Sequence, residues 1–125
     1  MTGKTIAENL ESVEFNKNQK VIRPYNNPLS PTGGVVGLKG NLAPEGAIVK
    51  VAGMQKTKFE GSAKCFDCEE DAFKCVINEE YQEGDVFVIR YEGPKGGPGM
   101  REMLSTTAAI SGQGMGNKVA LITDG

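Results

Sequence analysis

The chain has 125 residues, which is enough for one domain with a single hydrophobic core. Its composition, 38% hydrophobic and 24% charged, is that of an ordinary globular protein and is too apolar for a disordered one. The formal net charge of −2, from 14 basic and 16 acidic residues, provides no basic field for nucleic acid, and no apolar run approaches the length of a membrane span.

Two residue types restrict the chemistry. The chain contains no histidine, so it offers no imidazole base, no Ser-His or Cys-His pair and no histidine metal ligand. Its three cysteines, an odd number, argue against a disulfide framework and favour a reducing compartment, the cytoplasm or, in a eukaryote, an organelle matrix. Catalysis on this chain would have to use carboxylates, lysine, hydroxyls, thiols or a cofactor.

Residues 1–33 are predicted to form a connector that begins with a short helix. Ile6, Leu10 and Val13 recur at helical spacing, which predicts a short amphipathic helix within residues 2–15. The sequence "GKT" at 3–5 resembles the tail of a phosphate-binding P-loop, but the strand and spacer that should precede it are missing. We therefore interpret Thr2 or Thr5 as a helix cap.

The rest of the connector is predicted to be extended, because Pro24, Pro28 and Pro31 exclude a helix. From Gly34 to Gly125 the sequence predicts an α/β domain with a mixed sheet and flanking helices. Its predicted strands are β-branched runs bounded by Gly, Pro or Asp, namely "GVVGLKG", "GAIVKVAG", "AKCF", "DVFVIRY" and "KVALITDG". The run at 86–91 is nearly continuous in apolar character, which predicts a strand covered on both faces.

Two helices are predicted between these strands. The first has Asp67 as its N-cap and Glu70 three residues further on, which is the pattern of a capping box. Its apolar stripe consists of Ala72, Phe73, Val76 and Ile77. The second helix is expected to start near Met100 and to end at Gly112 or Gly114.

The segment "CFDC" raises the question of a metal site. Cys65 and Cys68 form a C-x2-C pair, which is half of a zinc or iron–sulfur site, and the chain has no second pair. Cys68 and Cys75 also fall on the apolar stripe of the predicted helix, where cysteine behaves as a small hydrophobe. We therefore interpret the cysteines as packing residues.

Two loops are candidates for a binding site. The loop "GNLAPEG" at 40–46 is satisfactory as a plain turn, and as a functional loop it would present Asn41 and Glu45; both interpretations stay open. The stronger candidate is "EGPKGGPGMREM" at 92–103, because it joins the end of the most apolar strand to a helix, where α/β proteins commonly bind ligands. Its glycines would let a ligand approach backbone N–H groups, and Pro94 and Pro98 would stiffen the loop.

Glu102 is the acidic residue expected in the first turn of the second helix, where it could simply satisfy the helix dipole. A single carboxylate does not bind Mg²⁺ well, because Mg²⁺ needs several oxygen ligands. The residues alone therefore predict an anion or metal site that is shared with another segment. The residues expected to form the substrate loop are Lys95, Gly97, Pro98, Gly99 and Met100, together with Asn41.

Four stretches resemble the C-terminal region of dihydroxy-acid dehydratases, members of a larger family that includes phosphogluconate and sugar-acid dehydratases. They are "NPLSPTGGVVGLKGNLAPEGAIVKVAG", "FDCEEDAF", "GDVFVIRYEGPKGGPGMREML" and "GNKVALITDG". The resemblance implies a swivelling β/β/α barrel-like domain, similar to the small domain of aconitase-type enzymes. It also implies a hydro-lyase of branched-chain amino-acid biosynthesis, which converts 2,3-dihydroxy-3-methyl acids to 2-keto acids.

The same resemblance implies two cofactors in the full-length enzyme. An iron–sulfur cluster would act as a Lewis acid on the departing hydroxyl, and Mg²⁺ would hold the substrate carboxylate and 2-hydroxyl. The family's C-terminal Mg²⁺ ligand is the Glu of a "GMxEM" segment, which corresponds to Glu102. The cluster cysteines and the remaining Mg²⁺ ligands belong to the family's N-terminal domain, and Cys65, Cys68 and Cys75 match none of them.

The resemblance also implies a fragment. The family's proposed base is a serine in "TDGRxSGG", and this chain stops at Gly125, just before it. We expect no catalytic residue within the chain and no activity of the chain alone. The expected partners are the N-terminal domain of the same polypeptide, a small dihydroxy acid and a second full-length subunit in a homodimer, with no nucleic acid and no membrane. The alternatives are a sugar-acid dehydratase domain (arabinonate, xylonate or phosphogluconate) and a non-catalytic carboxylate-binding module.

Overall fold

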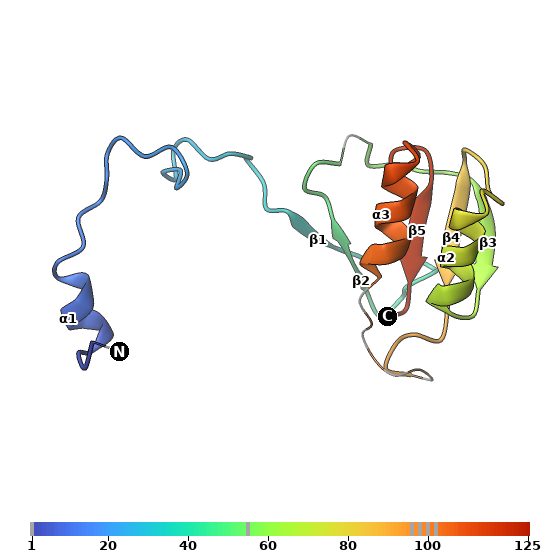
Figure 1. Ribbon diagram of the computed structural model, residues 1–125, viewed down its shortest axis with the longest axis horizontal. Helices are drawn as coiled ribbons and strands as arrows, with labels where there is room; N and C mark the ends of the chain where they lie inside the picture. Colours follow the sequence, from blue (N-terminus) through green and yellow to red (C-terminus); the bar gives the residue numbers. More distant parts are fainter. Residues whose placement is uncertain (1, 55, 96, 98, 100, 102) are drawn as a thin grey trace. The chain divides into compact units, whose positions relative to one another are not determined.

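The computed structural model describes residues 2–54, 56–95, 97, 99, 101 and 103–125. The chain divides into two compact units, Met1–Val49 and Lys50–Gly125 (Figure 1). Across the described ranges, every helix falls short of the length and apolar content that a membrane crossing requires.

The first unit begins with the short helix α1, Ile6–Leu10. Thr5 caps this helix in a capping box: its Oγ1 accepts a hydrogen bond from the Glu8 N–H at 3.3 Å, and Glu8 Oε2 accepts from the Thr5 N–H at 2.7 Å. The prediction of Thr5 as a cap is therefore confirmed. The helix lies within the stretch 2–15, as predicted, and because Ile6 and Leu10 are exposed, their packing does not support further turns.

A two-stranded sheet follows, formed by β1, Val35–Leu38, and β2, Ala47–Lys50. Both strands were predicted from their β-branched runs. The turn before β2 depends on Gly46, whose φ of 123° is one that other residues rarely adopt and whose N–H donates to the Ala43 carbonyl oxygen at 3.1 Å.

The sheet of the second unit consists of three parallel strands in the order β3-β4-β5. Their bounds are Ser62–Phe66 for β3, Asp85–Ile89 for β4 and Ala120–Thr123 for β5. A sheet of mixed direction was predicted, but both strand pairs are parallel. Each connection contains a helix that carries the chain back to the end where the previous strand began, so the next strand runs the same way.

Two helices lie on one side of this sheet and pack against each other (Figure 1). They are α2, Glu69–Ile77, and α3, Leu104–Gly112. Their buried residues meet the inward-facing side chains of β4 in one hydrophobic core, which consists of Ala72, Cys75, Val76, Phe87, Ile89, Ile110 and Val119. The helix α3 begins at Leu104 rather than near Met100, and its first turn contains no acidic residue.

The predicted capping box at the start of α2 is wrong. The N-cap residue is Cys68, and its side chain makes no capping hydrogen bond. Asp67 instead pairs with Arg90, the residue directly after β4, and its Oδ1 accepts a hydrogen bond from Arg90 Nε at 2.9 Å. The buried face of α2 is centred on Ala72, Cys75 and Val76, which places the helix's last residue, Ile77, at the margin with 54% of its surface exposed.

The central strand β4 is covered more completely on one face than on the other. Asp85, Phe87 and Ile89 are buried, whereas Val86 and Val88 are half-buried. The sequence predicted that both faces of this strand are covered. The face toward the helices is buried as predicted, whereas the opposite face is only half-buried. On the opposite face the register places Val88 between two exposed side chains, Cys65 and Ile122.

Phe87 should be the most sensitive position of the core. It is fully buried, its ring stacks on Phe66 at a centroid distance of 5.3 Å and it meets the Tyr81 ring edge-on at 5.3 Å. We expect Phe87→Ala to lower the free energy of unfolding by about 3–5 kcal/mol, because it removes these contacts and leaves a cavity. Urea unfolding followed by circular dichroism measures this, with the exposed Ile77→Ala as a control expected to cost under about 1 kcal/mol. Equal losses in the two variants would contradict this assignment of the core.

Candidate functional site

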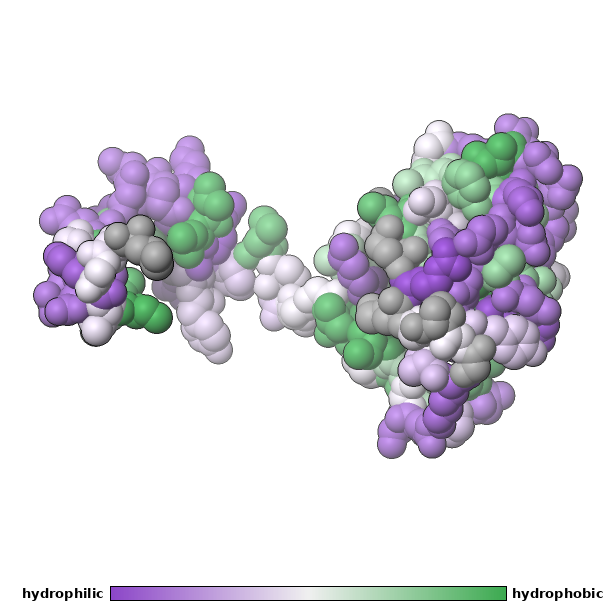
Figure 2. Space-filling model, turned by 60° about the horizontal axis from the view of Figure 1, so that its bottom comes forward, coloured by the Kyte–Doolittle hydropathy of each residue, from purple (hydrophilic) through white to green (hydrophobic). Residues whose placement is uncertain are grey.

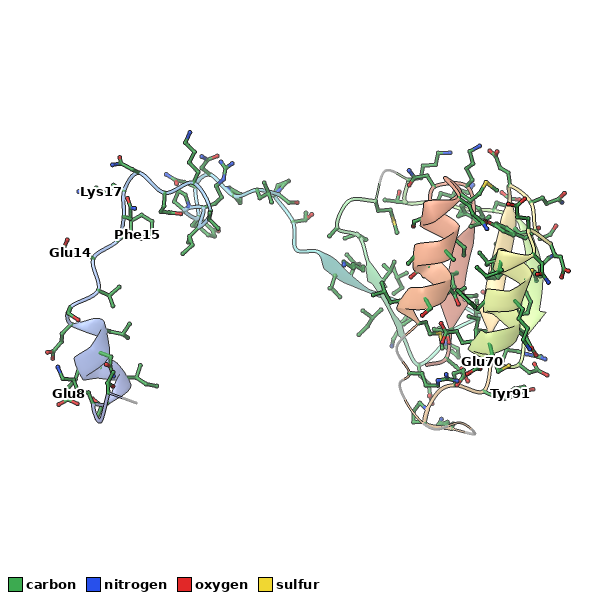
Figure 3. The ribbon with its side chains drawn as sticks, in the orientation of Figure 1. Glu8, Glu14, Phe15, Lys17, Glu70 and Tyr91 are labelled. Atoms are coloured by element: carbon green, nitrogen blue, oxygen red, sulfur yellow. The ribbon has the colours of Figure 1, made fainter. Side chains whose placement is uncertain are left out.

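The carboxyl ends of the three parallel strands meet at one end of the second unit, and this is where the candidate loop begins. The strand β4 ends at Ile89, and residues 90–103 lead from there to α3. Glu70, at the start of α2, and Tyr91, at the start of the loop, both lie at this end (Figure 3). Ligands of parallel α/β sheets commonly bind at this end of the strands, so it is the candidate site.

Asp124 fastens the start of the loop to the end of β5. Its carboxylate accepts hydrogen bonds from the N–H groups of Tyr91 at 3.0 Å and Glu92 at 3.1 Å. Tyr91 has a φ of 63°, which is uncommon for a residue other than glycine. The Arg90 guanidinium carbon lies 5.1 Å from the centroid of the Tyr91 ring, within the range of a cation–π contact. These interactions hold the chain in a strained turn directly after β4.

Glu92 turns inward from the loop and is only 3% exposed. Its Oε1 accepts a hydrogen bond from the backbone N–H of Glu69, the first residue of α2, at 3.0 Å. The unpaired N–H groups and the dipole at a helix N-terminus stabilise a carboxylate in this position. Because Cys68 provides no side-chain cap, Glu92 caps α2 from a distant part of the chain.

Arg101 holds the other end of the loop. Its Nη1 donates to Glu92 Oε1 at 2.9 Å, and its Nη2 donates to Glu70 Oε1 at 2.7 Å. Arg101 Nη2 also lies 3.9 Å from Glu69 Oε2, and the other oxygen of Glu69 accepts from the buried Thr106 hydroxyl at 3.0 Å. We call Glu69, Glu70, Glu92, Arg101 and Thr106 the carboxylate network; it ties the loop to both α2 and α3. Figure 2 brings this end of the unit toward the viewer and shows a hydrophilic patch across it.

The charges of this network stabilise one another. The hydrogen bond and the charge of Arg101 lower the pKa of Glu70 to about 2. In return, the hydrogen bonds to Glu70 and Glu92 raise the pKa of Arg101. Glu70 is therefore held ionised by an internal partner and is not available as a general acid near neutral pH.

Two glycines allow the loop to pack closely against backbone, in one case that of Asp124 after β5 and in the other that of the loop itself. A Cβ atom at Gly93 would lie 2.0 Å from the Asp124 carbonyl oxygen, and one at Gly97 would lie 2.1 Å from the Tyr91 carbonyl oxygen. No side chain fits at either position unless the backbone moves. The glycine content of the loop is required, at these two positions, by its own folding.

The predicted site residues are only partly described. Lys95, Gly97 and Gly99 lie in the loop, and Lys95 is exposed. Asn41 is exposed in the connection between β1 and β2 of the first unit. Pro98, Met100 and Glu102 lie outside the described residues, so the roles predicted for them stay predictions.

Apart from Glu70, the residues that organise this end of the sheet were not predicted from the sequence. A signal existed for Asp124, an acidic residue directly after a predicted strand, and for Glu92 and Arg101, opposite charges at the two ends of a glycine-rich loop. No sequence signal pointed to Thr106, because its partner Glu69 lies on a different helix.

The cysteines do not form a metal centre in the part of the chain that the structure describes, where no three His, Cys, Asp or Glu side chains gather in a suitable arrangement. All three are free: Cys75 is buried in the core, Cys68 is half-buried and Cys65 is exposed on β3. Burial raises the pKa of the Cys75 thiol, which keeps it protonated. The packing role predicted for Cys75 is confirmed, whereas the exposed Cys65 is not a packing residue. The described residues do not fit an iron–sulfur cluster.

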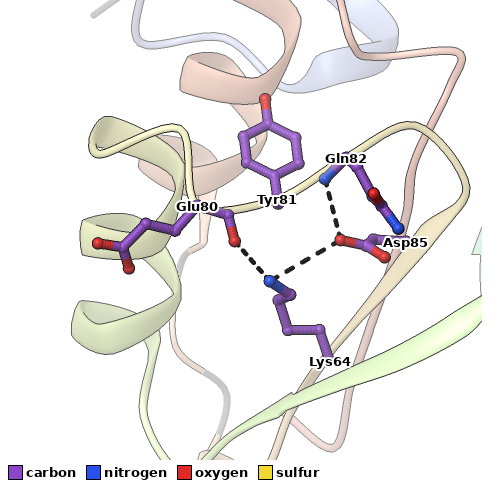
Figure 4. A pocket seen from close by; sticks show the side chains of 5 residues that line it. All are labelled: Lys64, Glu80, Tyr81, Gln82 and Asp85. Carbon is purple, nitrogen blue, oxygen red and sulfur yellow. Dashed lines mark hydrogen bonds and ion pairs between the residues drawn. The ribbon is translucent and has the colours of Figure 1, made fainter.

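A polar hollow lies where β3 and β4 begin, at the opposite end of the sheet from the candidate site (Figure 4). Lys64 Nζ donates to the Glu80 carbonyl oxygen and lies 3.9 Å from Asp85 Oδ2. The same carboxylate oxygen accepts from the Gln82 N–H at 3.0 Å. The charges of Lys64 and Asp85 are therefore compensated within the chain, and these contacts hold the turn that leads into β4.

The ion pair between Glu70 and Arg101 should make stability depend on acid pH. The pKa of Glu70 is about 2 in the folded state and 4.5 ordinarily, so its contribution is fully present above about pH 4.5 and is lost as the pH falls toward 2. We expect the free energy of unfolding, measured by urea titration at stepped pH, to fall more steeply over this range in the unsubstituted chain than in Glu70→Gln. The control is Glu83→Gln, which removes an exposed pair with Lys118 and should leave the slope almost unchanged. Parallel curves for the unsubstituted chain and Glu70→Gln would contradict the pairing.

Gly97→Ala should destabilise the chain, because the added Cβ would collide with the Tyr91 carbonyl oxygen. We expect a loss of about 1–3 kcal/mol in the free energy of unfolding, measured by urea titration. Gly112→Ala provides the matched control, because a Cβ there meets nothing within 4 Å, and its effect should stay within about 0.5 kcal/mol. If the two substitutions cost the same, the loop does not pack as described.

The comparisons with known proteins point to one family. The family model described as "Dihydroxy-acid/6-phosphogluconate dehydratase C-terminal" matches residues 20–125. The whole chain is 70% identical to "Dihydroxy-acid dehydratase 2" of Bradyrhizobium diazoefficiens over 125 residues, and it covers 22% of that relative. The "Dihydroxy-acid dehydratase" of Sulfurisphaera tokodaii is 57% identical over 127 residues, and the chain covers 23% of it. The chain thus spans less than a quarter of the length of these curated relatives, and it belongs to the dihydroxy-acid/6-phosphogluconate dehydratase family, whose C-terminal domain it matches.

Proposed function

We propose that the chain acts as the C-terminal domain of a dihydroxy-acid dehydratase, a hydro-lyase that converts 2,3-dihydroxy-3-methyl acids to 2-keto acids in branched-chain amino-acid biosynthesis. One observation carries the proposal: the similarity to dihydroxy-acid dehydratases extends over the whole chain at identities up to 70%. Identity at this level over all 125 residues supports a common activity. The substrate, the reaction and the pathway remain part of the proposal, because the chain spans only about a fifth of each relative.

The geometry supports a role in holding the substrate. The loop 90–103 leaves the carboxyl end of the central strand, and it is fastened by Asp124 at its start and by Arg101 at its end. Ends that are held in this way reduce the conformational entropy that is lost when a small acid binds. Within the proposal, Lys95, Gly97, Pro98, Gly99 and Met100 contact the substrate; Asn41, which belongs to the first unit, is a separate predicted contact.

The cofactors belong to the proposal as well. Mg²⁺ would hold the substrate's carboxylate and 2-hydroxyl, with Glu102 as one of its ligands, and an iron–sulfur cluster would act as Lewis acid. Among the carboxylates that the structure does describe at this end, Glu69, Glu70 and Glu92 are bound to Arg101, to a hydroxyl or to a backbone N–H. They are committed to the loop, so we derive no step of the reaction through either cofactor.

Within the same proposal, the chain adopts the swivelling β/β/α barrel-like fold, with residues 1–33 as connector and 34–125 as the domain. The parallel sheet β3-β4-β5 with its two helices and the separate sheet β1-β2 support an α/β class, and the barrel-like closure and the boundary after residue 33 are part of the proposal. The partners would be the family's N-terminal domain, which carries the cluster ligands, and a second full-length subunit. Three free cysteines are consistent with a reducing compartment such as the cytoplasm.

A chimeric enzyme tests the proposal. Residues 1–125 replace the corresponding segment of the Bradyrhizobium diazoefficiens relative, which is 70% identical over this length. We expect the chimera to form the 2-keto acid from 2,3-dihydroxyisovalerate, measured as keto-acid release, and Glu102→Gln in the chimera to lower the rate by more than about 100-fold, because it removes a metal ligand. The chain alone with Mg²⁺ should show no turnover.

The controls separate the alternatives. Arabinonate, xylonate and 6-phosphogluconate are assayed beside the dihydroxy acid, and turnover of a sugar acid in its place would favour a sugar-acid dehydratase. A folded chimera that binds the dihydroxy acid without converting it would favour a non-catalytic carboxylate-binding module. Full activity of the chimera carrying Glu102→Gln would remove that residue from the metal site.

A further inference from the structure

One face of the sheet β3-β4-β5 is apolar across all three strands and points away from both helices. We call it the open face, and it consists of Ala63, Cys65, Val86, Val88, Ala120 and Ile122. We propose that the open face is a docking surface for the part of a full-length dehydratase polypeptide that lies outside this chain. The inference rests on the proposed function in one respect, namely that the chain belongs to such a polypeptide.

The strand register places these six side chains on the same side of the sheet. Phe87 is buried against the helices, so its neighbours Val86 and Val88 point to the other side. Their cross-strand partners on β3 and β5 point there too. Three of the six residues are exposed, three are half-buried and none carries a charge. The open face is therefore a continuous apolar surface three strands wide.

The direction of the strands indicates that this surface is meant to be covered. Parallel sheets occur almost only where both faces are covered, whereas antiparallel sheets commonly leave one face in water and place polar residues on it. The open face has no such polar residues. The charged strand residues Lys64 and Asp85 alternate with them and belong to the face toward the helices.

The border of the open face at the carboxyl end of the strands is polar. Asp67 and Arg90 lie two residues beyond Cys65 and Val88, and Asp67 Oδ1 accepts a hydrogen bond from Arg90 Nε at 2.9 Å. The two charges compensate each other, so this border repels neither sign of charge. An apolar centre with polar residues at its border is the usual anatomy of a surface that another part of a protein covers.

The size of the open face decides between a second copy of the chain and a tethered segment. Three strands at a spacing of about 4.8 Å, each about five residues long, present roughly 250 Å². Two such faces would bury about 500 Å² together, whereas a stable association of separate molecules needs about 1,000 Å² or more. A segment of the same polypeptide needs less area, because its linkage keeps its effective concentration high. The area therefore favours an occupant from the same polypeptide.

The relatives contain the length of chain that such an occupant requires. The chain covers 22% of the Bradyrhizobium diazoefficiens relative and 23% of the Sulfurisphaera tokodaii relative, so more than three-quarters of each polypeptide lies outside the matched length. We assign the occupant to that remainder. Its contacting side chains should be apolar, because a charge placed against the open face would lose its water without gaining a partner.

The thiol of Cys65 reports whether the open face is covered. Cys65 is exposed on this face, whereas Cys75 is buried in the core and serves as an internal control for folding. Maleimide labelling, followed for each cysteine by mass spectrometry, compares the chain alone at low concentration with the chimera that carries residues 1–125. We expect Cys65 to react at least about 10-fold more slowly in the chimera, because the docked segment must open before the thiol is reached. Cys75 should react slowly in both.

Two isoleucines provide a matched pair of substitutions. Ile122 belongs to the open face and is 36% exposed, whereas Ile77 lies at the end of α2 and is 54% exposed. We expect Ile122→Lys in the chimera to return the labelling rate of Cys65 to within about threefold of the rate in the chain alone, because a covered lysine loses its water. Ile77→Lys should leave Cys65 protected.

The outcomes separate the possible occupants. Equal labelling of Cys65 in the chain alone and in the folded chimera overturns the docking, and so does protection that survives Ile122→Lys. Protection in the chain alone also overturns it: protection that increases with concentration assigns the open face to a second copy, and protection at every concentration assigns it to another part of this chain.

A second protein keeps the test decisive if the chimera does not fold, which rapid labelling of Cys75 would reveal. A cysteine is placed in the full-length Bradyrhizobium diazoefficiens relative at the position that aligns with Cys65. Rapid labelling of that cysteine in the active enzyme overturns the docking, and slow labelling supports it. Keto-acid release by the chimera is measured separately. A chimera that protects Cys65 without turnover counts against the proposed function and not against the docking surface.

Discussion

The end of the sheet that carries the site depends on one buried carboxylate. Glu92 lies against the N-terminus of α2, where a helix presents unpaired N–H groups, and it accepts from the first of them. A buried carboxylate is stable only when its charge is compensated. Arg101 provides that compensation and is held in turn by Glu70, so the loop, the helix and the ion pairs are fixed together.

This arrangement explains why α2 has an N-cap residue without a capping side chain. A local cap would have made the helix independent of the loop. Because the cap comes from Glu92, the first turn of α2 and the loop after β4 are stabilised by the same hydrogen bond. Thr106 extends this connection to α3 through its bond to Glu69, so all three elements contribute to the geometry of the site.

The sequence predicted the positions of strands and helices better than it predicted helix capping and strand direction. The β-branched runs located the strands, and the stripe around Ala72 and Val76 located the buried face of α2, because these signals come from local burial patterns. The capping box at Asp67 was wrong, since Asp67 pairs instead with Arg90, 23 residues later in the chain, and a local sequence pattern cannot reveal such a partner. Strand direction also depends on how helices return the chain, which the strand sequences do not encode.

The sequence predicted where the candidate site lies but not which contacts hold it together. The glycine-rich run after an apolar strand correctly located the loop at the carboxyl end of the sheet. Its glycines suggested open space for a ligand, whereas Gly93 and Gly97 are required where the backbone packs on itself. The contacts of Glu92 with α2 and of Asp124 with the loop arise only when distant strands lie side by side, so periodicity and motif spacing could not reveal them.

The position of β4 in the middle of the sheet has a consequence for how the chain folds during synthesis. Its neighbour β3 is made before it, but β5 follows only after the loop and α3 have been completed. Until Val119 to Thr123 leave the ribosome, one edge of β4 remains unpaired and Phe87 and Ile89 lack part of their cover. An open apolar edge can pair with another nascent chain. The order of the elements therefore makes the speed at which α3 and β5 dock a determinant of yield, independently of the stability of the finished domain.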